Sequence, residues 1–211
     1  MTVICWLFFH RALARIRPMD EGTITSRFYE SGEVKRRFVQ TYAPAILVLG
    51  ELLARAFRDG HKLLLFGNGG SATDASHIAA EFVGRYNQDR PPLPALALTT
   101  DMAAVTCVAN DYDYTRVFAR QIEAHGRTGD IVIALSTSGN SPNVLKGVEA
   151  ASRLGLITVG WTGRDGGKLA GMVAYPFLVP STVTARVQEC HLTLGHVLCE
   201  IVEEKLFATT S

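Results

Sequence analysis

The sequence predicts an α/β fold: a three-layer αβα sandwich with a five-stranded, parallel, doubly wound sheet and N-terminal helices. Short apolar runs alternate with helical patterns along most of the chain, which is typical of parallel sheets with right-handed crossovers. The run at residues 131–135 is continuously apolar and largely β-branched, as in a strand buried on both faces. Turns rich in glycine or serine directly follow two of these runs, at residues 67–72 and 136–141.

The N-terminal part is expected to be helical. Residues 26–42 are amphipathic and charged, and residues 44–58 are strongly helical, with Pro44 as the start signal. We therefore expect an N-terminal helical segment at 19–60, followed by the α/β domain at 61–211, within one globular unit.

The remaining elements follow in alternation. We expect strands at residues 62–66, 95–98, 131–135, 156–161 and 175–179. We expect helices at residues 71–85, 102–109, 114–124 and 143–153, near residue 168 and at 184–207. Ligands of doubly wound sheets bind beyond the carboxyl ends of the strands, so the glycine-rich and serine-rich turns mark the expected site.

The first eighteen residues differ from the rest of the chain. The apolar run at residues 3–9 is far too short to span a bilayer. Arginines follow this run instead of preceding it, the reverse of a secretory signal. We expect residues 1–18 to be an N-terminal extension with Met19 as the true start; the alternative is an ordered helix that packs on a partner subunit. Mass spectrometry of the natively expressed protein decides this, because an N-terminus at Met1 would reject the extension.

Composition narrows the function classes. The chain has 211 residues, 47% of them apolar, so one well-buried domain is available. A net charge of +1 offers no electrostatic attraction to nucleic acid or to an anionic membrane. The four cysteines form no C-x-x-C pair, and packed, reduced thiols fit a cytoplasmic protein best.

The turn Ser136-Thr137-Ser138-Gly139-Asn140-Ser141 is the most informative segment. It follows a buried strand and precedes a helix whose N-cap and first position suit Ser141 and Pro142. Backbone N–H groups, the positive end of the helix dipole and the hydroxyls then point to one spot, which predicts a phosphate-binding site. The alternative is an ordinary serine-rich turn between a strand and a helix.

The turn Gly67-Asn68-Gly69-Gly70-Ser71-Ala72 matches G-x-G-x-x-A, a dinucleotide-binding pattern. The acidic residue that should end the second strand is missing, since Asp89 lies too early and Asp101 too late. We expect instead that the glycines let backbone amides approach a small polar substrate.

Two helices carry side chains that suit metal binding or proton transfer. His77 and Glu81 are spaced i, i+4 on one helix face. Gln188 and His196 are separated on the last helix by a rise of about 12 Å and a rotation of about 80°, so long side chains can converge. Such a set can hold a metal ion or act as acid and base on one substrate. The alternative for His77 and Glu81 is a solvated surface pair, and His191 is expected to be a packed or exposed histidine without a catalytic role.

These motifs together resemble the sugar isomerase (SIS) family and, within it, the phosphoheptose isomerases. The similarity runs from about residue 62 to residue 207, through motifs at residues 67–71, 74–81, 110–111, 136–141, 165–168 and 188–196. The resemblance implies conversion of sedoheptulose 7-phosphate to D-glycero-D-manno-heptose 7-phosphate, an early step towards nucleotide-activated heptose for the bacterial surface. It also implies a homotetramer with active sites between subunits and one zinc ion per subunit.

The resemblance also implies a role for each matching position. The phosphate would be bound by Ser136, Thr137, Ser138 and Ser141. The sugar would be contacted by Asn68, Gly69, Gly70, Asn110 and Asp111, together with Glu81 and Gln188. The zinc ligands would be His77, Glu81, Gln188 and His196, with Glu81 as the base and His196 as the acid. A carboxylate held tightly by zinc is a poorer base, so an organising zinc and a zinc that polarises the carbonyl both stay open.

Three other functions are compatible with the SIS fold. A catalytically silent SIS protein that binds a replication initiator would generally lack the acid and base positions, and this chain keeps Glu81 and His196. An SIS sensor module of a transcription regulator needs a DNA-binding domain, and fewer than about seventy residues precede the first strand. An isomerase of another phosphosugar keeps the reaction and changes only the substrate.

Overall fold

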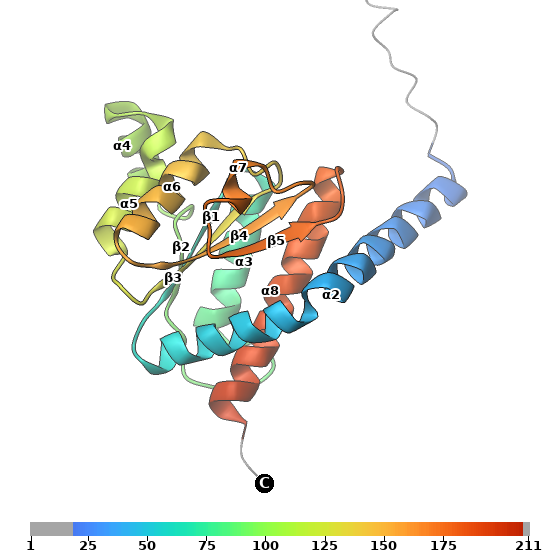
Figure 1. The fold of residues 1–211 in the computed structure, drawn as a ribbon, viewed down its shortest axis with the longest axis horizontal. Coiled ribbons are helices and arrows are strands. Elements are labelled where there is room, and N and C mark those ends of the chain that lie inside the picture. Colours follow the sequence, from blue (N-terminus) through green and yellow to red (C-terminus); the bar gives the residue numbers. More distant parts are fainter. Residues whose placement is uncertain (1–18, 209–211) are drawn as a thin grey trace, which may run out of the picture.

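The computed structural model describes residues 19–208 and has the predicted α/β architecture (Figure 1). Within these residues the five strands are all parallel and lie in the order β2-β1-β3-β4-β5. The strands are β1 (Leu63–Gly67), β2 (Ala95–Ala97), β3 (Ile131–Ser136), β4 (Ile157–Gly163) and β5 (Tyr175–Val179). The helices are α2 (Glu21–Arg58), α3 (Gly70–Val83), α4 (Met102–Asp111), the short 3-10 helix η1 (Tyr114–Arg116), α5 (Val117–His125), α6 (Pro142–Arg153), α7 (Gly167–Ala170) and α8 (Thr184–Phe207).

Helices cover both faces of the sheet. Alternate residues of β1 point to opposite sides, so that Leu63 and Leu65 join one buried cluster while Leu64 and Phe66 join another. The first cluster includes side chains of α2, α3 and α8, and the second includes side chains of α4, α5 and α6. Because every residue of β1 and β3 is buried, the sheet is the central one of three layers, as predicted.

The two turns predicted to form the site meet at the centre of the sheet. Strands β1 and β3 are neighbours, and the chain continues from β1 to β2 on one side and from β3 to β4 on the other. Such a reversal is the place where α/β sheets bind their ligands. At Gly67 the backbones lie so close that a Cβ would stand 2.8 Å from the carbonyl oxygen of Leu135. The carboxyl ends of β1 and β3 therefore hold both turns side by side.

Helix α2 differs from the sequence prediction. The predicted helix start at Pro44 is wrong, because one continuous helix of 38 residues includes this proline in its interior. A proline removes one hydrogen bond and bends the axis, and Figure 1 shows α2 changing direction along its length. The helix continues because later turns pack on α8, where Leu49 and Leu53 are fully buried. Tertiary packing thus outweighs the local cost of the proline.

The predicted extension at residues 1–18 lies outside the described residues. Among residues 19–208, no helix combines the length and the apolar character that crossing a membrane requires. The other helix and strand boundaries agree closely with the predictions, except that η1 replaces the first turn of the helix predicted at 114–124.

His191 is a packed histidine. Its side chain is buried on α8 beside Trp161, and its Nε2 donates a hydrogen bond to the carbonyl oxygen of Thr162 at 3.3 Å. Burial lowers the pKa of His191 to about 4, because the charged ring would lose its hydration. The ring is therefore neutral near neutral pH.

Protonation of His191 should lower the stability of the protein in mild acid. The ring titrates near 6.5 in the unfolded chain and near 4 in the folded chain, so between these values only the unfolded state takes up the proton. At pH 5 this linkage removes about 2 kcal/mol of unfolding free energy. We expect His191→Gln to lose less stability than the wild type between pH 7 and pH 5, measured by urea unfolding. Equal losses would show that another group is responsible.

Candidate active site

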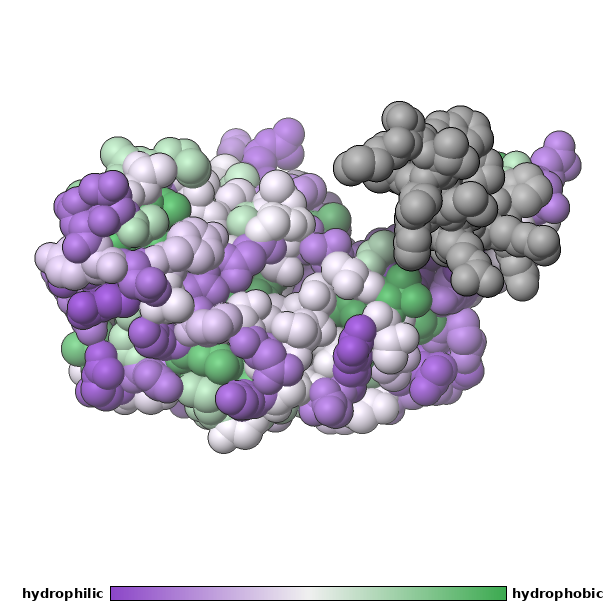
Figure 2. Space-filling model, turned by 90° about the horizontal axis from the view of Figure 1, so that it is seen from above, coloured by the Kyte–Doolittle hydropathy of each residue, from purple (hydrophilic) through white to green (hydrophobic). Residues whose placement is uncertain are grey.

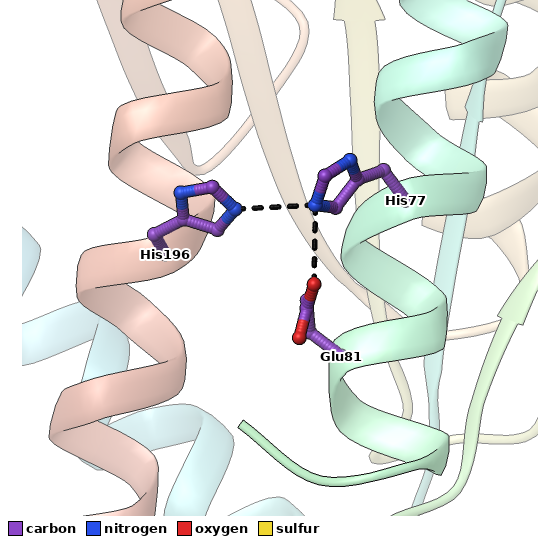
Figure 3. Close-up of side chains that lie close together, drawn as sticks. All are labelled: His77, Glu81 and His196. Carbon is purple, nitrogen blue, oxygen red and sulfur yellow. Dashed lines mark hydrogen bonds and ion pairs between the residues drawn. The ribbon is translucent and has the colours of Figure 1, made fainter. Parts of the chain in front are cut away.

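Helices α3 and α8 bring three predicted site residues together. His77 and Glu81 lie one turn apart on α3, and His196 faces them from α8 (Figure 3). His77 Nε2 lies 3.1 Å from Glu81 Oε1 and 3.3 Å from His196 Nε2. One ligand atom from each residue lies within 4.8 Å of those of the other two. The cluster can therefore act on one small group or hold one ion.

The cluster has more hydrogen-bond acceptors than donors. A neutral His77 ring carries at most one proton on Nε2, and this atom faces both Glu81 Oε1 and His196 Nε2. One cation at the centre would satisfy all three side chains. Zinc with tetrahedral ligands at about 2.0–2.1 Å keeps those ligands about 3.3 Å apart, close to both observed separations. The residues present therefore fit a zinc ion.

Gln188 lies on α8 ahead of His196. Its amide stands against Gly70 at the start of α3, so closely that a Cβ on this glycine would overlap the amide nitrogen. Only glycine allows the two helices to approach in this way. The structure places Gln188 at the glycine-rich turn, and its role as the fourth zinc ligand stays a prediction.

The serine-rich turn closes on itself at the carboxyl end of β3. Ser136 and Ser141 place their hydroxyl oxygens 3.2 Å apart, and Ser138 Oγ accepts the Asn140 N–H at 3.2 Å. Ser141 occupies the N-cap position of α6 as predicted, but its hydroxyl forms no capping hydrogen bond within that helix. The hydroxyl turns to Ser136 instead, which leaves the positive end of α6 facing the turn.

A second loop holds the serine-rich turn in shape. Gly139 has φ +65°, and a Cβ there would collide with the carbonyl oxygen of Gly166. The Gly139 carbonyl accepts the Leu169 N–H at 3.0 Å, and the Thr137 carbonyl accepts an amide at the end of β4 at 3.2 Å. The Asp-Gly-Gly-Lys motif at residues 165–168 thus supports the turn from the neighbouring strand.

Asn68 is held by side chains that no sequence motif marks. Its amide exchanges two hydrogen bonds with Asn143 of α6, at 2.9 and 2.8 Å, and accepts the Tyr114 hydroxyl at 3.1 Å. The pair ties the glycine-rich turn to the start of the helix that follows the serine-rich turn. Gly69, with φ +54°, has open space where a Cβ would stand, so its backbone is accessible to a ligand.

Asn110 and Asp111 end α4 at the surface. Asn110 donates to Asp111 Oδ1 at 2.8 Å, and this bond lowers the pKa of Asp111. In the described part of the chain, no hydrogen bond joins this pair to the other predicted site residues. A cavity of about 430 Å³, lined by Asn68, Gly69 and Thr106 among others, lies between the glycine-rich turn and α4. Contact of Asn110 and Asp111 with a sugar stays a prediction.

Asp74 is an acid to which sequence reasoning gave no role. It lies one turn before His77 on α3, and its Oδ2 is buried without a hydrogen-bond partner among residues 19–208. Burial raises the pKa of Asp74 to about 6, while the charge of His77 lowers it. Its place at the start of the motif at residues 74–81, one turn ahead of His77 on the same helix, is the signal that could have marked it.

Comparison with known proteins places the chain in a family. The SIS domain family matches residues 28–163. A phosphoheptose isomerase of Aquifex aeolicus is 55% identical over 177 residues, which cover 84% of this chain and 93% of that protein. The chain belongs to the phosphoheptose isomerase family.

Solved structures of phosphoheptose isomerases share the fold. The protein from Francisella tularensis has a TM-score of 0.85 at 35% identity, over 89% of this chain and 100% of its own. The protein from Neisseria gonorrhoeae has a TM-score of 0.82 at 38% identity, over 87% of this chain and 98% of its own. Both turns of this phosphoheptose isomerase family member lie inside the matched SIS segment, whereas His196 lies beyond it on α8. The cluster of His77, Glu81 and His196 therefore needs α8 in addition to that segment.

Proposed function

We propose that this chain interconverts D-sedoheptulose 7-phosphate and D-glycero-D-manno-heptose 7-phosphate, an aldose–ketose isomerisation in ADP- or GDP-heptose biosynthesis for the bacterial surface. One observation carries the proposal: a chain of the phosphoheptose isomerase family brings Glu81 and His196 to one point. A carboxylate and an imidazole placed together can move protons between adjacent carbons and their oxygens.

The proposed reaction passes through an enediol. With the open-chain ketose bound, Glu81 takes a proton from C1 while His196 gives a proton to the oxygen on C2. Glu81 then returns its proton to C2, and His196 takes a proton from the oxygen on C1, which leaves the aldose. Each side chain ends in its starting state, so the reaction is a net isomerisation.

The phosphate would bind at the serine-rich turn, beyond β3. The hydroxyls of Ser136, Thr137, Ser138 and Ser141 and the positive end of α6 supply donors there. Backbone amides of Gly69 and Gly70 would face the sugar from the neighbouring turn. His77 lies about 10 Å farther along α3 than Gly70, which a phosphorylated seven-carbon chain can span.

We extend the proposal to one zinc ion per subunit, held by His77, Glu81 and His196 with Gln188 as the fourth ligand. When bound, zinc would organise the site or polarise the substrate carbonyl. Zinc would compete with proton transfer for the same atoms: Glu81 would have to bind the ion loosely to keep its basicity, and His196 Nε2 carries a proton to give only while it is not a ligand. A tightly bound zinc would therefore be architectural. Metal analysis tests the site, together with thermal unfolding before and after chelation. A protein purified without zinc and indifferent to chelators would count against the ligand set.

We also propose a homotetramer that acts in the cytoplasm. Apolar side chains of α2 are exposed, among them Phe28, Val39 and Leu47. Figure 2 shows apolar residues at the surface among hydrophilic ones. Exposed apolar side chains gathered on one element are typical of subunit interfaces. The free thiols of the three described cysteines support a reducing compartment. Light scattering of the purified protein should give the mass of four subunits, and the mass of one would contradict the assembly.

Incubation with sedoheptulose 7-phosphate and a panel of other ketose phosphates tests the function. We expect the aldose product from sedoheptulose 7-phosphate at a much higher rate than from any other member of the panel. If only a different ketose phosphate gives a product, the proposed substrate is wrong but the proposed isomerisation stands. No product from any of them would overturn the isomerase.

Loss of the turn hydroxyls should weaken substrate binding more than turnover. Ser138→Ala and Ser141→Ala each remove a donor to the phosphate, which is held alike in the ground and transition states. We expect KM to rise about tenfold in each variant, the value of one hydrogen bond to a charged group, with little change in kcat. Ser152→Ala, at an exposed position near the C-terminal end of α6, is the matched control and should leave both constants unchanged. A large fall in kcat at an unchanged KM would contradict this.

A further inference from the structure

A buried ion pair lies beside the acid–base cluster and has no role in the reaction steps above. Arg90 follows α3 in the chain, and Glu203 lies on α8 beyond His196. Their side chains are 1% and 3% exposed, and Arg90 Nε donates to Glu203 Oε1 at 2.9 Å. A pair this deeply buried persists only when its remaining hydrogen bonds are satisfied.

The Glu203 carboxylate also holds the loop that leaves α3. It accepts the backbone N–H groups of Tyr86 at 3.1 Å, Asn87 at 3.0 Å and Gln88 at 3.2 Å. Burial by itself raises the pKa of Glu203, but these amides and Arg90 outweigh it and hold the pKa below its ordinary value. The carboxylate is therefore ionised and fixes three consecutive residues.

Arg90 holds the end of helix α3. Its guanidinium donates to the carbonyl oxygens of Phe82 at 2.8 Å and of Glu81 at 2.9 Å. Both carbonyls belong to the last turn of α3, where the helix itself offers no further amide. Arg90 thus fixes the turn that carries Glu81.

Tyr86 extends the same constraint to His196. The two rings are stacked, with centroids 5.6 Å apart and planes inclined by 26°. The Tyr86 hydroxyl also donates to Glu200 Oε1 at 3.4 Å. Because Glu203 accepts the Tyr86 backbone N–H, the ion pair holds the backbone from which this ring extends towards His196.

We propose that the Arg90–Glu203 pair is a positioning clamp for the acid–base couple. Arg90 fixes the helix turn of Glu81, and Glu203 fixes Tyr86 against His196. Proton transfer between one substrate and side chains on two different helices needs both side chains held within a fraction of an ångström. The catalytic consequence rests on the proposed function, whereas the geometric one does not.

Kinetics of Glu203→Gln test the clamp. This variant keeps the side-chain shape and removes the charge, so we expect kcat to fall about tenfold to a hundredfold while KM stays within about threefold. Arg90→Lys should behave alike, because an ammonium cannot reach both the carboxylate and the two carbonyls.

Asp130→Asn is the matched control. Asp130 is equally buried, accepts the N–H groups of Lys62 and Arg127 and pairs with the Lys62 ammonium, but these partners lie just before β1 and β3 and not on α3 or α8. We expect it to lower the unfolding temperature and to leave kcat unchanged. A Glu203→Gln variant that is folded and keeps the kcat of Asp130→Asn would overturn the clamp.

Variants of Tyr86 test the same path without touching the ion pair. Tyr86→Phe keeps the stacked ring and should stay within about threefold of the wild-type kcat, whereas Tyr86→Ala should lose about tenfold. Combined with Glu203→Gln, Tyr86→Ala should cost less than the product of the two separate losses, because both act through one ring. If the fold-losses in kcat of the two single variants multiply fully in the double variant, the path through Tyr86 is wrong. Tyr86→Ala remains informative if Glu203→Gln fails to fold.

The NMR signals of the His196 ring separate the clamp from the reaction. We expect these signals to shift in Glu203→Gln and in Tyr86→Ala and to stay in place in Asp130→Asn. The measurement needs no substrate, so a wild type that isomerises nothing would reject the proposed function and leave the clamp testable. Unmoved His196 signals in both clamp variants would reject the clamp even in an active isomerase.

Discussion

Glu81→Gln should abolish isomerisation while leaving the fold intact. Glutamine has nearly the shape of glutamate but no basic carboxylate, so the proton on C1 of the ketose would have no acceptor. We expect kcat to fall about a thousandfold or more, near the upper range for loss of a general base. The fold should persist, because the Glu81 side chain is partly exposed and its partner is His77 on the same helix. Turnover of sedoheptulose 7-phosphate and circular dichroism are the two measurements.

Glu149→Gln is the matched control for this variant. Glu149 is an exposed glutamate on α6, and its replacement should leave kcat and KM unchanged. The zinc content of Glu81→Gln distinguishes the two proposed roles of Glu81, as a zinc ligand and as the general base. If the variant loses turnover but retains zinc, the loss comes from the missing base. A rate within about tenfold of the wild type would remove Glu81 as the base.

Gly139→Ala should disrupt the turn at residues 136–141, where we propose that the phosphate binds. A φ of +65° costs an alanine about 1–2 kcal/mol, and its Cβ would overlap the carbonyl oxygen of Gly166. The turn must then move away from the loop before α7, and its hydroxyls and amides no longer converge. We expect kcat/KM to fall about a hundredfold, the loss typical of a misplacement of about 1 Å. Inhibition by inorganic phosphate should weaken in parallel.

Gly60→Ala separates backbone strain from steric overlap. Gly60 has φ +81°, but open space lies where its Cβ would stand. The variant should lose some stability through the backbone alone and keep its kinetic constants. If Gly139→Ala also keeps the wild-type KM, the geometry of the turn is not what holds the phosphate.

Local patterns predict those parts of the molecule that local physics determines. The apolar run at residues 131–135 is a buried strand wherever the sheet lies, because its side chains suit no exposed element. The i, i+4 spacing of His77 and Glu81 places both side chains on one helix face in any context. The continuity of α2 through Pro44 lies beyond such patterns, because packing on α8 determines it.

The residues that position the site carry no motif. Arg90 and Glu203 stand 113 residues apart and meet only in the folded chain. Asn143 lies 75 residues from Asn68 and likewise contacts it only in the folded chain. A charged or amide side chain at such a distance looks like an ordinary polar residue until its buried partner is known. Sequence patterns therefore mark candidate reacting groups more readily than the residues that hold those groups in place.

A crystal structure with bound sedoheptulose 7-phosphate tests the central claim most directly. The quantities to measure are the distances from the sugar C1 to the Glu81 carboxylate and from the oxygen on C2 to His196 Nε2. We predict the phosphate in the turn at residues 136–141 and both distances within about 3.5 Å. A sugar whose C1–C2 edge lies beyond the reach of these two side chains, in every subunit of the assembly, would contradict the claim.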